Sequence, residues 1–229
     1  MKKGRIDLFR LAVHLSAWLP LAWLVWDYTQ GNLSVNPIQD ITQRTGKYAL
    51  VLLTLSLACT PLNTLFGFRP ALRVRRALGL YAFLYAGLHF LVFVGLDYGF
   101  DLSLIPAAIF EKRFVIVGLA ALLILLALAA TSFKSSMKRL GKNWKRLHRL
   151  VYVAGGLVIV HYSWAVKGDV LSLQGDIVQP LAFGAVVTLL LALRLPFIRS
   201  RIAGLRSRWS RPFGRQPARP NRVPGPNRG

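Results

Sequence analysis

The stretch LHRLVYVAGGLVIVHYSWAVK, residues Leu147–Lys167, decides how the rest of the chain is interpreted. It is an apolar span with His148 at one end, His161 near the other and the pair Gly155-Gly156 between them. An imidazole inside lipid costs free energy unless something satisfies it, so a histidine deep in such a span is a functional-site hypothesis. Two interpretations stay open for His161 here: a hydrogen bond to a neighbouring helix, or ligation of a metal.

The composition indicates a membrane protein. The chain has 229 residues, of which 54% are hydrophobic and 17% are charged, a profile that is rare in soluble domains. The formal charge of +22 comes from Lys and Arg between apolar runs and near the C-terminus, with no folded basic domain to present a groove. We therefore expect no nucleic acid partner, and expect the charge to set topology and to bind anionic lipids at the cytoplasmic face.

The single cysteine excludes several kinds of site. Cys59 lies inside an apolar run and has no second thiol to pair with, so we expect neither a disulfide nor a zinc or iron-sulfur centre. No C-x-x-C-H motif is present for covalent attachment of haem.

Six apolar segments divide the chain, and each is near the length that about 30 Å of hydrocarbon requires of a helix. This predicts an all-α fold, a six-helix transmembrane bundle. The first segment lacks a small-residue cleavage site, so we interpret it as a retained span rather than a signal peptide. The six expected spans are residues 8–26, 48–66, 77–96, 114–133, 150–166 and 178–198.

The charges of the connections predict the orientation. Strongly basic segments occur at residues 1–10, 68–76, 134–149 and from 199 onward, so these belong in the cytoplasm and both termini are cytoplasmic. Seven of the eight acidic residues lie in the three opposite connections. We expect residues 1–198 to form a membrane domain. Residues 199–229, rich in Arg and Pro, are expected to be a disordered cytoplasmic tail.

Other sequence patterns add little. The long outer connection Asp27–Lys47 carries turn-forming residues, and we expect it to cover the outer end of the bundle. We find no internal repeat, no phosphate-binding loop and no dinucleotide-binding fingerprint.

Two histidines are expected at the same depth. His89 follows Arg76 by about 20 Å of helix and His161 follows Arg149 by about 18 Å, and the two spans run in the same direction. Equal depth in the outer half is what a bis-histidine haem requires, with one imidazole on each face of the iron. The pair His89 and His161 is therefore the predicted haem-iron site, and the haem is of the b type because it lacks thiol attachment.

The other two histidines lie near the cytoplasmic edge. On a straight helix His148 would point about 140° away from His161, so the two share a face only if the segment is distorted or begins after His148. For His148 we weigh a second haem site against an interfacial cation. His14 is more simply a histidine that is hydrogen-bonded near the headgroups, and it is the remaining intramembrane candidate for a second haem ligand.

Several motifs together resemble a known family. They are NPIQDITQRTGKYAL (36–50), ACTPL (58–62), RRALGLYAFLYAGLHF (75–90), GKNWKRLHRLVY (141–152) and HYSWAVK (161–167). From about Leu11 to Pro196 the chain resembles the MsrQ (YedZ) family, haem-binding membrane subunits in the ferric-reductase-like transmembrane group. The basic tail lies outside the resemblance. Ferric reductases and NADPH oxidases of this group carry two histidines in the third span, whereas this chain has only His89 there.

The resemblance implies a function for the chain. It implies a multi-pass protein of the bacterial inner membrane, an electron-transfer subunit rather than a catalytic one. This subunit takes electrons from respiratory quinol, with FMN as a candidate carrier. Electrons would pass to MsrP, a periplasmic molybdopterin enzyme that reduces methionine sulfoxide in oxidised proteins. The resemblance makes His89, His148 and His161 candidate haem ligands and assigns no residues to flavin or quinone. The alternatives are a free-standing ferric or quinone reductase and, in another class, a small transporter or membrane anchor without haem.

Overall fold

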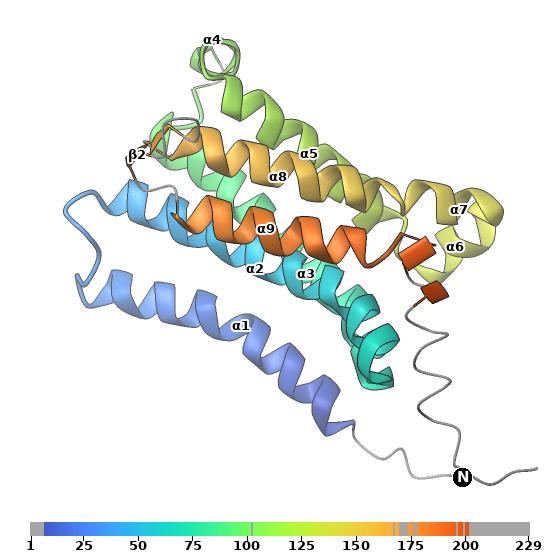
Figure 1. Ribbon diagram of the computed structural model, residues 1–229. Helices are drawn as coiled ribbons and strands as arrows, with labels where there is room; N and C mark the ends of the chain where they lie inside the picture. Colours follow the sequence, from blue (N-terminus) through green and yellow to red (C-terminus); the bar gives the residue numbers. More distant parts are fainter. Residues whose placement is uncertain are drawn as a thin grey trace, which may run out of the picture.

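The computed structural model describes residues 7–101, 103–166, 168–169, 174–175, 178–195, 197–198 and 200–201, and these residues are mainly helical. Long helices run side by side along one direction (Figure 1) and each overlaps one of the predicted apolar segments. They are α1 (Leu8–Thr29), α2 (Pro37–Phe66), α3 (Arg69–Val92, continued by the π-helical turn Phe93–Asp97), α5 (Arg113–Ala130), α8 (Leu150–Ala165) and α9 (Val178–Ala192).

Four of these helices are long and apolar enough to cross a membrane: α1, α2, α3 with its π-helical turn, and α5. The helices α8 and α9 are shorter, with 16 and 15 residues. The all-α fold class is confirmed over the described part of the chain, with one small exception. Residues Gly168–Asp169 (β1) pair antiparallel with Gln174–Gly175 (β2), a short hairpin that the sequence did not predict.

The helix α2 begins at Pro37, well before the predicted span at residue 48. The Asn36 side chain caps this end by accepting the Gln39 N–H over 3.1 Å, and Pro37 suits the first turn because that turn needs no N–H donor. The expectation that Asp27–Lys47 is a long covering connection is therefore wrong, because only residues 30–36 leave the helices. Residues 37–47 are mostly polar, so hydrophobicity alone did not indicate that they form the first turns of α2.

The connections at the two ends of the bundle also contain helices. The basic segment 134–149 folds into α6 (Lys134–Leu140) and α7 (Lys142–Leu147), and α4 (Leu104–Glu111) precedes α5 at the other end. Gly141 separates α6 from α7 with φ of +50°, a conformation that a residue with a Cβ rarely adopts. Each short helix lies beyond the ends of the long ones (Figure 1).

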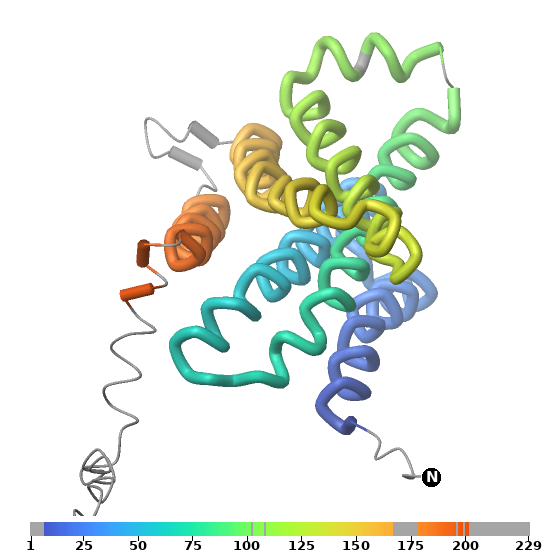
Figure 2. Tube along the Cα trace, turned by 90° about the vertical axis from the view of Figure 1, so that its right-hand side faces the viewer, coloured from blue at the N-terminus to red at the C-terminus, as the bar shows by residue number. Residues whose placement is uncertain are grey.

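Two antiparallel helix pairs form the centre of the fold. The helices α2 and α3 pack along their length, α5 and α8 do the same, and α3 touches α5 (Figure 2). Ala82 of α3 and Ala154 of α8 are fully buried, and small residues allow helix backbones in membranes to approach closely. The helix α9 covers α8 and α2.

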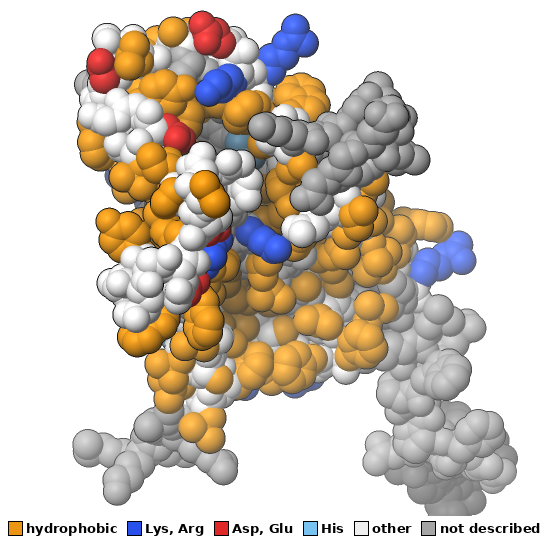
Figure 3. Space-filling model, turned by 90° about the vertical axis from the view of Figure 1, so that its left-hand side faces the viewer, with side chains coloured by type: hydrophobic (Ala, Val, Ile, Leu, Met, Phe, Trp, Pro, Cys, Tyr) orange, Lys and Arg blue, Asp and Glu red, His pale blue; other side chains and the backbone are white. Residues whose placement is uncertain are grey.

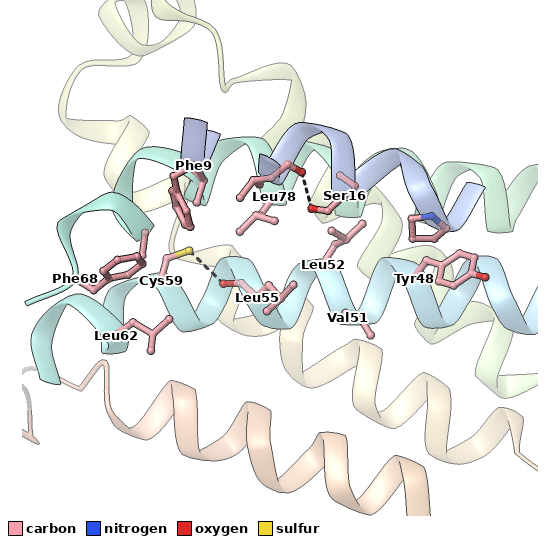
Figure 4. A pocket seen from close by; sticks show the side chains of 15 residues that line it. Phe9, Ser16, Tyr48, Val51, Leu52, Leu55, Cys59, Leu62, Phe68 and Leu78 are labelled. Atoms are coloured by element: carbon pink, nitrogen blue, oxygen red, sulfur yellow. Dashed lines mark hydrogen bonds between the residues drawn. The ribbon is translucent and has the colours of Figure 1, made fainter. Parts of the chain in front are cut away.

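The helix α1 is attached more loosely. The fully buried Tyr85 of α3 donates its hydroxyl to the Ala17 carbonyl over 2.8 Å and accepts the Leu21 N–H over 3.1 Å, beside Pro20. This anchors α1 at a proline, where its own hydrogen bonds are interrupted. Apolar side chains of α1, α2 and α3 also line a cavity of about 380 Å³ (Figure 4), bounded by Phe9 and Phe68.

Candidate metal centre

The structure brings His89 of α3 and His161 of α8 into contact. Their ring centroids lie 6.0 Å apart with an angle of 84° between the ring planes. Both side chains are partly buried, and no loop takes part, because each residue lies within a regular helix. Rigid helices therefore hold the two imidazoles at a defined separation.

The ring of His89 is fixed by α2. Its Nδ1 atom lies 2.9 Å from the carbonyl oxygen of Thr42. Because a carbonyl can only accept, Nδ1 must carry the hydrogen, and the Nε2 lone pair of the neutral ring is then free for a metal. The ring lies against Gly46, where an added Cβ would come within 3.1 Å of Nδ1.

The ring of His161 is fixed by α5 in the same way. Its Nδ1 atom donates to the carbonyl oxygen of Phe114 over 2.7 Å. The ring lies against Gly118, where an added Cβ would come within 2.6 Å of Nδ1, closer than real Cβ contacts. The Nε2 atom of His161 is thus also left unprotonated.

These two arrangements repeat each other. In both hydrogen bonds the histidine lies 47 residues after the residue whose carbonyl it binds. Each residue of the His89 arrangement lies 72 positions before its counterpart in the His161 arrangement. The matched positions are Thr42 and Phe114, Gly46 and Gly118, Ala82 and Ala154, and His89 and His161. The sequence shows no obvious repeat, because few residues are identical at this spacing, but the same histidine, glycine and carbonyl arrangement recurs in α2–α3 and in α5–α8.

The pair fits a metal held between two axial imidazoles. A nitrogen ligand lies about 2 Å from a transition metal and the centre of its ring roughly 3 Å away, so two rings on opposite sides of an ion lie about 6 Å apart. Among the described residues no cluster of three or more His, Cys, Asp or Glu could hold a metal ion. A bare ion would lack ligands here, whereas an iron already held in a porphyrin needs only these two.

His148 lies apart from this pair. It caps α7, and α8 begins at Leu150, so the helix that carries His161 does begin after His148. Its Nε2 atom lies 3.3 Å from the hydroxyl of Thr131, and its ring stacks on Trp144 with centroids 4.1 Å apart. Burial lowers the pKa of His148 although the Thr131 contact opposes it, and a neutral ring keeps its capacity as a ligand.

Comparison with known proteins identifies the family. The profile described as "Ferric reductase like transmembrane component" matches residues 45–159. Curated relatives named "Protein-methionine-sulfoxide reductase heme-binding subunit MsrQ" are 43% identical over 204 residues in Rhodospirillum rubrum (88% of this chain, 95% of that protein). The relative of the same name in Deinococcus radiodurans is 48% identical over 159 residues (69% of this chain, 78% of that protein). The one in Bordetella pertussis is 42% identical over 177 residues (77% of this chain, 84% of that protein). The chain belongs to the MsrQ family. No solved structure matches it significantly.

Family membership gives the location and the general role. A ferric-reductase-like MsrQ protein with several membrane-spanning candidate helices is a multi-pass bacterial membrane protein of electron transfer. The matched profile includes Gly46, His89, Gly118 and His148, and it ends just before His161.

The fourth histidine of this MsrQ chain has a different neighbour. The Nδ1 atom of His14 lies 3.0 Å from the Tyr81 hydroxyl of α3, and the described contacts of His14 and His148 involve different elements. The residue 72 positions before His148 is Arg76, whose guanidinium lies 6.0 Å from the Phe133 ring centroid. A second haem site therefore stays a prediction, with His148 and His14 as its candidate ligands.

Sequence reasoning missed the residues that orient the histidines. Gly46 and Gly118 were not singled out, and the accepting groups of Thr42 and Phe114 belong to the backbone. One signal was present in this MsrQ chain: the separation from Gly46 to His89 equals that from Gly118 to His161.

Proposed function

We propose that this chain is the membrane-embedded electron-transfer subunit of a protein-methionine-sulfoxide reductase system, with haem b bound between His89 and His161. The observation that carries the proposal is the pair of imidazoles 6.0 Å apart, each with Nδ1 bound to a helix carbonyl. The printed names of the curated relatives, which say "heme-binding", support the choice of cofactor.

We propose that residues 1–198 form six membrane spans with both termini in the cytoplasm. The basic segments 68–76, which includes the first turns of α3, and 134–149 lie at one end of the bundle (Figure 1), as the positive-inside rule requires of a cytoplasmic face. The helices α8 and α9 are short for a span, and tilt or local thinning of the bilayer would accommodate them. The tail from residue 199 lies almost entirely outside the described residues, and its disorder stays a prediction.

The residues of the chain would hold the haem and tune it. When bound, haem supplies one-electron chemistry through its ferric and ferrous iron. The Nε2 atoms of His89 and His161 would provide the two axial ligands. The carbonyls of Thr42 and Phe114 accept a hydrogen bond from each Nδ1–H, which keeps Nε2 unprotonated and orients it for ligation.

Electrons would leave at the outer end, toward an MsrP-type periplasmic molybdoenzyme. His89 lies about 12 Å of helix from Asp97, much nearer this end than the cytoplasmic one. Acidic side chains occur on the outer face (Figure 3), where Asp97 and Asp101 are exposed. Asp27 and Asp40 also lie at this end, but Arg44 pairs with both. Quinol as donor and FMN as carrier belong to the proposal on the family resemblance alone.

A visible difference spectrum, reduced minus oxidised, tests the cofactor. We expect the bands of a low-spin b-type haem, and we expect acid-acetone to extract the colour because no covalent attachment exists. A colourless protein would favour a transporter or anchor without haem. Haem that quinol reduces but that purified MsrP with a methionine sulfoxide substrate cannot reoxidise would favour a free-standing reductase.

A further inference from the structure

We propose that Gly46 and Gly118 are positioning residues, whose missing side chains let each histidine lie on a neighbouring helix and hydrogen-bond its backbone one turn away. The inference rests on the proposed function, in which His89 and His161 are the axial ligands. Neither glycine touches the expected iron, so each acts through an imidazole.

The steric step follows from the two close approaches. In each pair the accepting carbonyl lies four residues before the glycine, at Thr42 for Gly46 and at Phe114 for Gly118. Residues four apart lie on one helix face, so the imidazole must cross the glycine to reach the carbonyl. A Cβ would come within 3.1 Å of Nδ1 at position 46 and within 2.6 Å at position 118.

The electronic step follows from the hydrogen bond. A carbonyl that accepts from Nδ1–H draws that proton away from the ring and makes Nε2 a stronger donor to a metal. A stronger donor favours the ferric state, so this bond lowers the reduction potential of a bound haem. If a side chain at position 118 pushes the ring off the carbonyl of Phe114, the reduction potential should rise.

The two glycines are not equivalent. At 3.1 Å the ring of His89 needs to move by only a few tenths of an ångström, whereas 2.6 Å at Gly118 forces a real displacement of His161. The position-118 variant should therefore have the larger effect. A general loss of helix stability would not give this order, because Gly to Ala raises helix propensity at both sites.

The first experiment compares Gly118→Ala and Gly46→Ala with Gly79→Ala. The control glycine lies on α3, where an added Cβ would make only an ordinary contact of 3.4 Å with Ser56. We expect Gly118→Ala to convert most of the ferric low-spin electron paramagnetic resonance signal to high spin or to a new low-spin form, and to raise the reduction potential. Gly46→Ala should do the same more weakly, and Gly79→Ala should match the wild type. Wild-type signals and potentials in both site variants would overturn the proposal.

The second experiment needs no haem. In haem-free protein with ¹⁵N-labelled histidine, His89 and His161 should appear as neutral rings protonated at Nδ1, and Gly118→Ala should abolish this state for His161. Wild-type rings protonated at Nε2 would sink the positioning role whatever the haem content. The Nδ1 form in a wild-type protein that binds no haem would instead sink the proposed function and leave the positioning role standing. If Gly118→Ala does not insert, Gly46→Ala supports or overturns the proposal in both experiments.

Discussion

Arg194, which follows α9, donates a hydrogen bond over 2.7 Å to the carbonyl oxygen of Leu57 in α2. The helical partner of that carbonyl would be the N–H of residue 61, and Pro61 has none. An unsatisfied carbonyl inside a membrane costs several kcal/mol. The guanidinium thus replaces the donor that the proline removes, and it also lies 5.6 Å from the ring centroid of Tyr152 in α8.

This relationship predicts a coupled pair of substitutions. Arg194→Gln should lower the free energy of unfolding by about 1.5–3 kcal/mol, the range for hydrogen bonds to charged groups. In a Pro61→Ala background the helix supplies its own N–H, so the same substitution should cost less. Unfolding of the detergent-solubilised protein in a double-mutant cycle measures the coupling, with Lys142→Gln as an exposed control. Equal losses in both backgrounds would show that Arg194 does not substitute for the missing donor.

The histidine pair predicts a shared spectral loss. His89→Ala and His161→Ala should each remove the same low-spin haem signal while the protein still inserts, because loss of either axial ligand breaks six-coordination. His14→Ala should retain that signal, since His14 contacts Tyr81 instead. Absorption and electron paramagnetic resonance spectra of the purified variants provide the measurement. A His89→Ala protein with the spectrum of the wild type would dismiss the pairing.

The ion pairs of Arg44 predict a graded effect at the outer end. The guanidinium joins the buried Asp27 of α1 to α2, and it also binds Asp40 one turn before it. Asp27→Asn should lower the free energy of unfolding by about 1.5–3 kcal/mol, because it weakens a charged hydrogen bond between helices. Asp40→Asn should cost about 1 kcal/mol or less, as for a pair within one helix. Thermal unfolding compares the two, and the reverse order would exclude Arg44 as the tie between α1 and α2.

Apolar runs predicted where the helices lie, because burial in lipid demands a nearly continuous hydrophobic stretch. They could not predict that α2 starts at Pro37 or that residues 134–140 and 142–147 form the helices α6 and α7. Those polar segments are ordered by caps and turns such as Asn36 and Gly141 rather than by hydrophobicity.

The histidines could be predicted from the sequence because an imidazole in a hydrophobic span is chemically conspicuous. Their supports could not, since Gly46 and Gly118 matter for a side chain that they lack and Thr42 and Phe114 matter for backbone carbonyls. The role of Arg194 was hidden for a similar reason, because its partner is the backbone of Leu57.

Electron exit at the outer face predicts how docking depends on charge. Asp97 and Asp101 are exposed at the end of the bundle nearest His89, and electron transfer needs only brief, polar docking. If these carboxylates steer a partner, neutralising both to Asn should slow reoxidation of the haem by purified MsrP with a methionine sulfoxide substrate. Added salt should slow it in the wild type. Neutralising Asp7, near the other end of the bundle, should have no effect.

The measurement uses quinol-reduced membrane vesicles of known orientation, with MsrP added to one side at a time. Reoxidation should follow only where MsrP meets the periplasmic face, because His89 and His161 lie in the outer half of their helices and electron transfer weakens steeply with distance. Unchanged rates for the Asp97 and Asp101 double variant would remove the steering role and leave the exit side intact. Reoxidation only from the cytoplasmic face would overturn both the orientation of the bundle and the delivery of electrons to a periplasmic enzyme, since the basic segments 68–76 and 134–149 would then lie on the wrong side.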